Sequence, residues 1–219
     1  MEQLSARINS LSPSATIAMN QKGRELKDKG VDVINLSVGE PDFMTPDHIK
    51  EAAKKAIDGP WHHYAPVAGY PDLLKAIVEK FKRENNLDYK PSNIMVSVGA
   101  KHSLANVMLC MINKGDEVIV PAPYWVSYAE QVKLAEGVNV VLDTTVEDEF
   151  KISAQQLEDA ITPKTKALLL CSPSNPTGSV YTKEELAALA VVIAKHPGIF
   201  VIADEIYEHI NFVGGHESI

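Results

Sequence analysis

Two polar side chains stand directly after apolar segments, where they could do chemistry. Asn175 follows the apolar run KALLLC within the segment SPSNPTG, and Asp204 follows the apolar run IFVIA. Short apolar runs of this kind are typical of buried strands, and open α/β sheets bind their ligands at the carboxyl ends of the strands. The spacing therefore predicts a pocket that both side chains reach.

Asp204 provides the sharper of the two arguments. An ionised carboxylate directly after five apolar residues must find a partner or lose much of its solvation energy, and a protonated pyridine nitrogen would be a suitable partner. Taken alone, Asp204 could also form an ordinary salt bridge or cap a helix. Asn175 could be a plain turn residue, but the prolines on both sides stiffen its loop and permit a cis peptide bond, which suits an aimed side chain.

A third candidate is the turn SVGAKHS. Gly99 and Ala100 lie between a predicted strand and the start of a predicted helix, where free amides and the helix dipole favour an anion such as phosphate. Any strand-to-helix turn can use glycine, so this signal is weak by itself. The lysine-serine ending of a P-loop is absent, which argues against nucleotide triphosphate hydrolysis.

Composition excludes several other classes of function. The chain has 219 residues, 45% of them hydrophobic, which is enough for a sizeable core. Lys and Arg number 21 against 29 Asp and Glu, for a net charge of −8, and no basic stripe suggests a nucleic-acid partner. Neither an apolar leader nor an apolar run of membrane-spanning length is found. We therefore expect a soluble cytoplasmic protein that binds neither nucleic acid nor a membrane.

Other reactive residues have simpler interpretations. Cys110 and Cys171 lack metal-type spacing and are expected to be reduced thiols in core-like surroundings. His62 and His63 have no third ligand at zinc-like spacing, so no metal site is expected. The acidic run at 147–149 is interpreted as a solvated loop. A G-x-S-x-G motif is absent, so serine hydrolysis has no support.

Strand and helix patterns alternate, which predicts an α/β fold with a mostly parallel sheet covered by helices. A helix is expected from the cap Ser14 to a stop at Gly30, and two amphipathic helices are expected over 46–58 and 70–85. The strands are predicted at 94–98, 117–121, 138–142, 166–171 and 199–205. Helices are predicted after the first four, over 99–112, 126–136, 153–161 and 183–196.

Seven segments together resemble the class I aminotransferases, fold-type-I enzymes that use pyridoxal phosphate, and in particular their bacterial aspartate aminotransferase branch. The segments are SPSATIAMN, LSVGEPDF, YAPVAGYPDL, SVGAKHSLAN, PAPYWVSYAE, CSPSNPTG and ADEIYE, in the family's order. The resemblance implies a three-layer, mostly parallel sheet. Residues 1–45 would form an N-terminal arm and small-domain segment, and residues 46–219 the first part of the large, cofactor-binding domain.

The resemblance also implies roles for the polar residues at the strand ends. Asp204 would hold the proton on the pyridine nitrogen of pyridoxal phosphate, so that the ring accepts electrons. Asn175 and Tyr207 would hydrogen-bond the ring's phenolic oxygen, although Tyr207 could be a core tyrosine. Trp125 would stack on the ring and contact substrate, although a tryptophan at a strand-to-helix junction is more often part of a core.

Phosphate, substrate and subunit contacts are implied for the remaining matches. Gly99, Ala100 and Lys101 match the phosphate-binding turn, and Tyr64 matches the tyrosine that reaches the neighbouring subunit's cofactor, which implies a homodimer. The backbone amide of Gly39 would meet the substrate carboxylate, although Gly39 could be a simple turn residue. Lys101 would face the distal carboxylate of aspartate or glutamate. The alternative is that Lys101 only neutralises the phosphate or faces solvent. Asn175 would also contact substrate.

The family's Schiff-base lysine is expected to lie beyond this chain, after a further strand. Lys183 and Lys195 fall in a helical pattern and are not expected to replace it. Residues 1–219 alone are therefore expected to be inactive. They are also expected to be poorly stable, because the family's next strands insert between those at 94–98 and 199–205 and would leave edges unpaired here. The full-length enzyme would transfer the amino group of an amino acid, expected to be aspartate, to 2-oxoglutarate. Two alternatives stay open: another fold-type-I enzyme, such as a carbon-sulfur lyase or decarboxylase, and a ligand-sensing module without catalysis.

Overall fold

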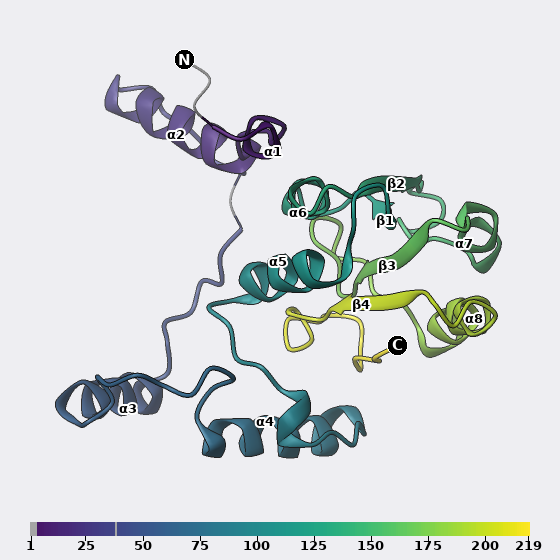
Figure 1. Ribbon diagram of the computed structural model, residues 1–219. Coiled ribbons are helices and arrows are strands. Elements are labelled where there is room, and N and C mark those ends of the chain that lie inside the picture. Colours follow the sequence, from purple (N-terminus) through teal and green to yellow (C-terminus); the bar gives the residue numbers. More distant parts are fainter. Residues whose placement is uncertain (1–3, 38) are drawn as a thin grey trace. The chain divides into compact units, whose positions relative to one another are not determined.

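A computed structural model of the protein describes residues 4–37 and 39–219 (Figure 1). Its contacts divide the chain into two compact units. One unit is Ser14–Val96, and the other combines the residues up to Pro13 with Ser97–Ile219. The boundary between residues 45 and 46 that the sequence suggests stays a prediction. Val38, within the LSVGEPDF segment, lies outside the described residues.

Helices dominate the described part of the unit Ser14–Val96, and their starts agree with the sequence. Ser14 caps the first of them through its hydroxyl oxygen, which accepts a hydrogen bond from the Ile17 amide, and Gly30 follows its end with a φ of 81°. Pro71 occupies the first turn of another, where its missing amide proton costs nothing. The helices are α2 (Ala15–Asp28), α3 (Asp47–Asp58), α4 (Pro71–Asn85) and the short 3-10 helix η1 (Pro91–Asn93).

The second unit contains a four-stranded sheet in which every neighbouring pair is parallel, in the order β2-β1-β3-β4. The expected parallel α/β fold is thus confirmed. The strands are β1 (Glu117–Ala122), β2 (Val138–Asp143), β3 (Thr165–Cys171) and β4 (Phe200–Asp204). The helices are α1 (Ala6–Asn9), α5 (Ala100–Met111), α6 (Ser127–Leu134), α7 (Ala154–Ala160) and α8 (Lys183–Ala194).

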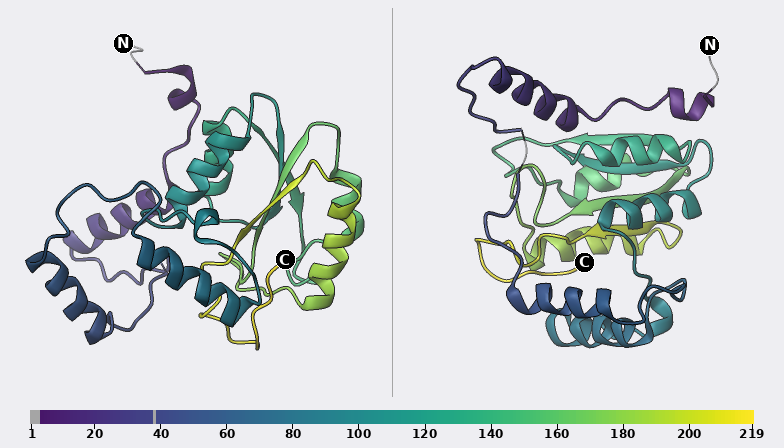
Figure 2. Two further views of the ribbon diagram at one scale, coloured as in Figure 1. Left: turned by 60° about the horizontal axis from the view of Figure 1, so that its bottom comes forward. Right: turned by 90° about the vertical axis from the view of Figure 1, so that its left-hand side faces the viewer.

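Two hydrophobic clusters, one on each face of the sheet, make up the core of this unit. Alternate side chains of a strand point to opposite faces. Accordingly, Val118 and Leu169 pack with residues of α5 and α6, whereas Ile119 and Leu168 pack with residues of α7 and α8. Figures 1 and 2 show the sheet between these two helix layers. The central strand β3 is apolar and almost continuously buried, as a parallel strand covered on both faces must be.

The strand order determines where the candidate site lies. The chain runs from β1 outward to β2 and then crosses back to β3, so the connections leaving β1 and β3 turn in opposite directions. Such a switch point leaves a crevice at the carboxyl ends of the two strands. The segments that contain Trp125, Asn175 and Asp204 leave β1, β3 and β4 at this same edge.

Two expectations about local structure are wrong. Residues 94–98 form no strand, because a strand requires a partner and no strand of the described residues pairs with this segment; the Val96 amide donates instead to the Ala68 carbonyl. Cys110 is exposed rather than core-like, since it lies on the face of α5 away from the sheet. Both cysteines are free thiols, as expected. Among the described residues, no helix combines the length and hydropathy that a membrane crossing requires.

Candidate active site

Asp204 lies at the carboxyl end of β4 and is only 7% exposed. Its Oδ2 accepts a hydrogen bond of 2.7 Å from the Tyr128 hydroxyl, and its Oδ1 accepts one of 3.3 Å from the Ile206 amide. Within residues 4–37 and 39–219, no Lys, Arg or His nitrogen forms an ion pair with it. The ordinary salt bridge is therefore not its explanation in this part of the chain, and a buried carboxylate without a countercharge needs a cation.

Tyr128 is a residue of the candidate site that the sequence reasoning missed. It is 1% exposed, and burial, together with the neighbouring Cys171 and Asp204, raises its pKa far above the usual value for tyrosine. The phenol therefore stays protonated and donates to Asp204. Its position could have been found from PYWVSYAE, because a residue three places after Trp125 at the start of a helix lies on the same side as Trp125. The two rings meet edge to face, with centroids 5.5 Å apart.

Asn175 and Tyr207, expected to share one oxygen of a ligand, do lie together. The Asn175 Nδ2 donates to the Tyr207 hydroxyl oxygen at 3.2 Å, although 32 residues separate them. Both side chains are partly buried, and the Ser172-Pro173 and Asn175-Pro176 peptide bonds are cis. A ligand oxygen placed between the two side chains would be offered an amide and a phenol as donors.

The predicted anion site lies at the start of α5. Gly99 precedes the helix with a φ of 85°, a value that glycine adopts without strain. The amides of Ala100 and Lys101 belong to the first helical turn, which has no intrahelical acceptors, so they are free to bind an anion. The Lys101 side chain turns back over Trp125, with its Nζ 4.8 Å from the ring centroid. Anion site and indole are therefore adjacent.

The other two predicted site residues, Gly39 and Tyr64, belong to the unit Ser14–Val96. Apart from its neighbours in the chain, no atom of the described residues lies within 4 Å of where a Cβ of Gly39 would be, so its backbone is open to close approach. Tyr64 is completely exposed and lies between α3 and α4. The structure describes this unit by itself, and the roles of both residues stay predictions.

The residues of the sheet unit fit pyridoxal phosphate. Asp204 is a buried anion that can hold the proton on a ring nitrogen, and Trp125 has an aromatic face on which a ring can stack. Asn175 and Tyr207 provide two donors for a phenolic oxygen, and the first turn of α5 provides amides for a phosphate. The carboxylate, the aromatic ring and the hydrogen-bond donors of the site thus correspond to the ring nitrogen, the ring face, and the phenolic oxygen and phosphate of this cofactor.

Comparison with known proteins gives consistent matches. A family model described as aminotransferase class I and II matches residues 31–218. An aspartate aminotransferase of Bacillus sp. (strain YM-2) is 52% identical over 219 residues, which are 100% of this chain and 56% of that protein. A probable aspartate/prephenate aminotransferase of Rickettsia bellii (strain RML369-C) is 52% identical over 214 residues, which are 98% of this chain and 54% of that protein.

A solved structure of Thermus thermophilus aspartate aminotransferase with maleate superimposes with a TM-score of 0.95 at 48% sequence identity. The superposition covers 100% of this chain and 57% of the Thermus chain. The protein therefore spans about half the length of the curated relatives that it matches. Sequence and fold agree over that half.

Proposed function

Because the chain belongs to the class I and II aminotransferases, we propose that it binds pyridoxal phosphate and contributes to the transfer of an amino group from an amino acid to a 2-oxo acid. The observation that supports this most strongly is Asp204, a carboxylate that is 7% exposed and has no cationic side chain as partner in the described residues. A homodimer and a cytoplasmic location are part of the same proposal. The position of the Schiff-base lysine outside this chain stays a prediction.

Each residue of the site has a distinct part in the mechanism. Bound pyridoxal phosphate supplies a ring that accepts the electron pair left when the α-proton of an amino acid is removed. Asp204 holds the proton on the ring nitrogen, because a negative charge at hydrogen-bond distance raises the affinity of that nitrogen for its proton. Tyr128 orients Asp204 with a 2.7 Å hydrogen bond.

The remaining residues orient the cofactor and limit water. Asn175 and Tyr207 donate to the phenolic oxygen and stabilise its anionic form. Trp125 would stack on one face of the ring, and its own ring packs edge to face with Tyr128. The amides at the start of α5 hold the phosphate, with the helix dipole adding attraction.

Binding of the cofactor is tested by titrating the product of the complete gene with pyridoxamine phosphate in a calorimeter, since this form needs no covalent bond to a lysine. We expect saturable binding to one site per chain. Asp204→Ala should weaken the affinity at least about tenfold, because the protonated ring nitrogen loses its countercharge. Failure of the unmodified protein to bind would contradict the proposal.

Aspartate is the proposed amino donor, with Lys101 as the group that recognises its distal carboxylate. The Lys101 Nζ lies 4.8 Å from the centroid of the Trp125 ring, and the relatives named above include an aspartate aminotransferase at 52% identity. In the product of the complete gene, Lys101→Ala should lower the preference for aspartate over alanine by about 10- to 100-fold, as expected for a lost charge-assisted contact. The exposed Lys164→Ala provides the control. An unchanged preference for aspartate over alanine would show that Lys101 does not recognise the distal carboxylate of the substrate.

Prephenate is a second candidate acceptor. The Rickettsia bellii relative, named for both aspartate and prephenate, is as similar to this chain as the Bacillus relative named for aspartate alone. The two are separated by supplying aspartate with either prephenate or 2-oxoglutarate and measuring which acceptor is aminated.

A further inference from the structure

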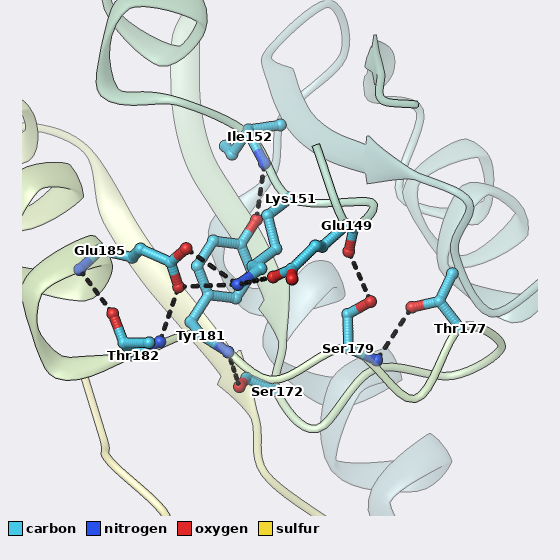
Figure 3. A network of polar contacts seen from close by, with 9 residues as sticks. All are labelled: Glu149, Lys151, Ile152, Ser172, Thr177, Ser179, Tyr181, Thr182 and Glu185. Atoms are coloured by element: carbon cyan, nitrogen blue, oxygen red, sulfur yellow. Dashed lines mark hydrogen bonds and ion pairs between the residues drawn. The ribbon is translucent and has the colours of Figure 1, made fainter. Parts of the chain in front are cut away.

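Lys151 is a buried cation outside the candidate active site. Its side chain is 9% exposed, and its Nζ lies 2.7 Å from a carboxylate oxygen of Glu149 and 2.8 and 3.0 Å from the two of Glu185 (Figure 3). Burial disfavours the charged ammonium, but the hydrogen bonds to Glu149 and Glu185 outweigh this effect and raise the pKa of Lys151. The ammonium therefore stays charged and bound to both carboxylates.

Glu185 connects this cation to the start of α8. Its Oε2 accepts a hydrogen bond of 2.7 Å from the Thr182 amide, while its own amide donates to the Thr182 hydroxyl oxygen at 3.2 Å. This reciprocal pair is a capping box, which fixes the first turn of a helix. Because α8 directly follows the loop that contains Asn175, Lys151 is anchored at the point where that loop ends.

The segment around Lys151 also holds the loop itself. The Ile152 amide donates to the Tyr181 hydroxyl oxygen at 2.9 Å, and the Tyr181 amide donates to the Ser172 hydroxyl oxygen at 3.2 Å. The Ser179 hydroxyl donates to the Glu149 carbonyl. Figure 3 shows these bonds around Lys151. Residues 149–152 thus contact the loop at Ser179 and at its last residue, Tyr181.

Asn175 lies inside a closed part of the same loop. The Ser174 amide donates to the Ser179 carbonyl, and the Gly178 amide donates to the Ser174 carbonyl, both at 2.9 Å. Between these bonds, Asn175 reaches the Tyr207 hydroxyl at 3.2 Å. A shift of Ser179 would move the backbone that aims Asn175.

Backbone strain next to Lys151 makes its ion pairs more important. Glu149 and Phe150 have φ values of 53° and 58°, a left-handed conformation that residues with a side chain rarely adopt. Residues keep such a backbone conformation only when the contacts around them hold it in place. Here the Lys151 ammonium forms an ion pair with the side chain of Glu149. Phe150 lines the same small cavity as Asn175 and Tyr128, so this strained segment borders the candidate site.

We propose that Lys151 is a positioning residue that fixes the loop 172–181 through Glu185 and Glu149 and thereby aims Asn175 at the phenolic oxygen of the cofactor. The part of this inference that concerns the cofactor rests on the proposed function. The part that concerns the loop does not, so the two can fail separately.

The loop is tested by hydrogen exchange on the cofactor-free product of the complete gene. Lys151→Met, which keeps the stem but removes the charge, should speed exchange of the Ser174, Gly178 and Tyr181 amides by about tenfold relative to β1 and β3, because local opening no longer breaks the ion pairs. Lys151→Arg should restore most of the protection. Lys195→Met removes an exposed lysine paired with Glu158 and serves as the control.

Unchanged exchange in residues 172–181 of Lys151→Met, with β1 and β3 still protected, would overturn the proposal. If Lys151→Met does not fold, Glu149→Gln replaces it, since Glu149 is 75% exposed and its removal is milder. The same pattern of faster loop exchange is then expected at about threefold, as fits the loss of one partner of two. Equal exchange in this variant would again count against the proposal.

The cofactor arm uses the pH at which the absorption of bound pyridoxal phosphate changes. A misaimed Asn175 stabilises the phenolate less, so Lys151→Met should raise this midpoint by about half a pH unit, and Asn175→Ala should raise it further. In the Asn175→Ala background, Lys151→Met should add nothing. A full additional shift would mean that Lys151 does not act through Asn175 and would refute this arm. Altered loop exchange without cofactor binding by the unmodified protein would contradict the proposed function but support the fixing of the loop.

Discussion

Lys151 and Asp204 are both charged and both almost completely buried, yet their surroundings treat them in opposite ways. Lys151, 9% exposed, has two carboxylates within 3.0 Å of its ammonium. Asp204, 7% exposed, receives one phenol and one amide hydrogen bond but no opposite charge from the described residues. The described residues thus provide countercharges for Lys151 but none for Asp204.

The difference separates a structural charge from a binding charge. A buried ion that is fully paired stabilises a conformation, here the turn at 149–152 and the start of α8, and has no capacity left for a ligand. A buried ion that lacks a countercharge has lost solvation energy without compensation, and a cationic ligand can supply that compensation when it binds. Three variants, each with a control or a pH series, test this comparison.

The largest effect is expected for Asp204→Asn. Loss of the negative charge removes the partner of the ring nitrogen, so kcat/KM for transamination should fall about 1000-fold, in the range measured when one electrostatic contact to a reacting group is removed. Stability should not fall, because an uncompensated buried charge disappears. Activity and urea denaturation of the complete gene product measure both.

Asp143→Asn is the matched control, since Asp143 also ends a strand but is exposed. Its activity should equal that of the unmodified enzyme. We take a residual activity of about one third as the level above which Asp204 has no role in the transition state. If Asp204→Asn keeps more than that, the charge of Asp204 does not serve to bind the cofactor.

Lys151→Met should show the opposite signature, with a loss of stability. The two carboxylates lose their common partner, but they are 75% and 40% exposed and regain water. We therefore expect the free energy of unfolding to fall by only about 1–2 kcal/mol, below the cost of orphaning fully buried ions. Urea titration measures it, with Lys195→Met expected to change stability by less than about 0.5 kcal/mol. A more stable Lys151→Met would show that the paired charge does not stabilise this region.

Tyr128→Phe sharpens the comparison at Asp204. The variant leaves the carboxylate with the Ile206 amide as its remaining donor in the described residues, so the free energy of unfolding should fall by about 1 kcal/mol. Cofactor affinity should fall a few-fold, since Asp204 is less well oriented. Tyr124→Phe, for a neighbouring tyrosine that is not bonded to Asp204, is the control for denaturation and for calorimetric titration. If Tyr128→Phe and Tyr124→Phe change stability and cofactor affinity equally, Tyr128 does not belong to the candidate site.

The smallest effect concerns pH. Although burial opposes it, hydrogen bonds from Lys151 and the Thr182 amide lower the pKa of Glu185 below its ordinary 4.5, while the pKa of Lys151 is raised above its ordinary 10.5. A lowered carboxylate pKa stabilises the fold above pH 4.5 and ceases to do so as the pH falls through the folded value. A raised lysine pKa stabilises it below pH 10.5 and ceases to do so as the pH rises through the folded value.

The stability difference between the unmodified protein and Lys151→Met should therefore be constant between about pH 5 and pH 10 and shrink on both sides. Denaturation midpoints across this range measure it. A difference that grows on acidification would mean that Glu185 is not a partner of Lys151.

Local patterns predicted all four strands of the sheet but also a strand at residues 94–98 that does not form. β1 and β3 were predictable because both are apolar and buried on two faces, which leaves an unmistakable run in the sequence. Residues 94–98 have an equally good strand pattern but form no strand, because pairing depends on a neighbour that a local pattern cannot supply.

The candidate site divides in the same way. Asp204 and Asn175 were found because a polar residue directly after an apolar run is locally anomalous. Tyr128 was missed, since a tyrosine in the first turn of a helix is ordinary until its partner, 76 residues later, is known. The ion pair of Lys151 with Glu185 likewise joins residues 34 positions apart, and neither residue is unusual in its own segment.

The contact of Lys101 and Tyr128 with the indole of Trp125 has a consequence for spectroscopy. The protein has two tryptophans, and the second, Trp61, belongs to the unit Ser14–Val96. Replacing Trp61 by phenylalanine would leave Trp125 as the single fluorophore, with a cation 4.8 Å above its ring. Its emission would then report the arrival of any near-ultraviolet chromophore in the crevice, without a label.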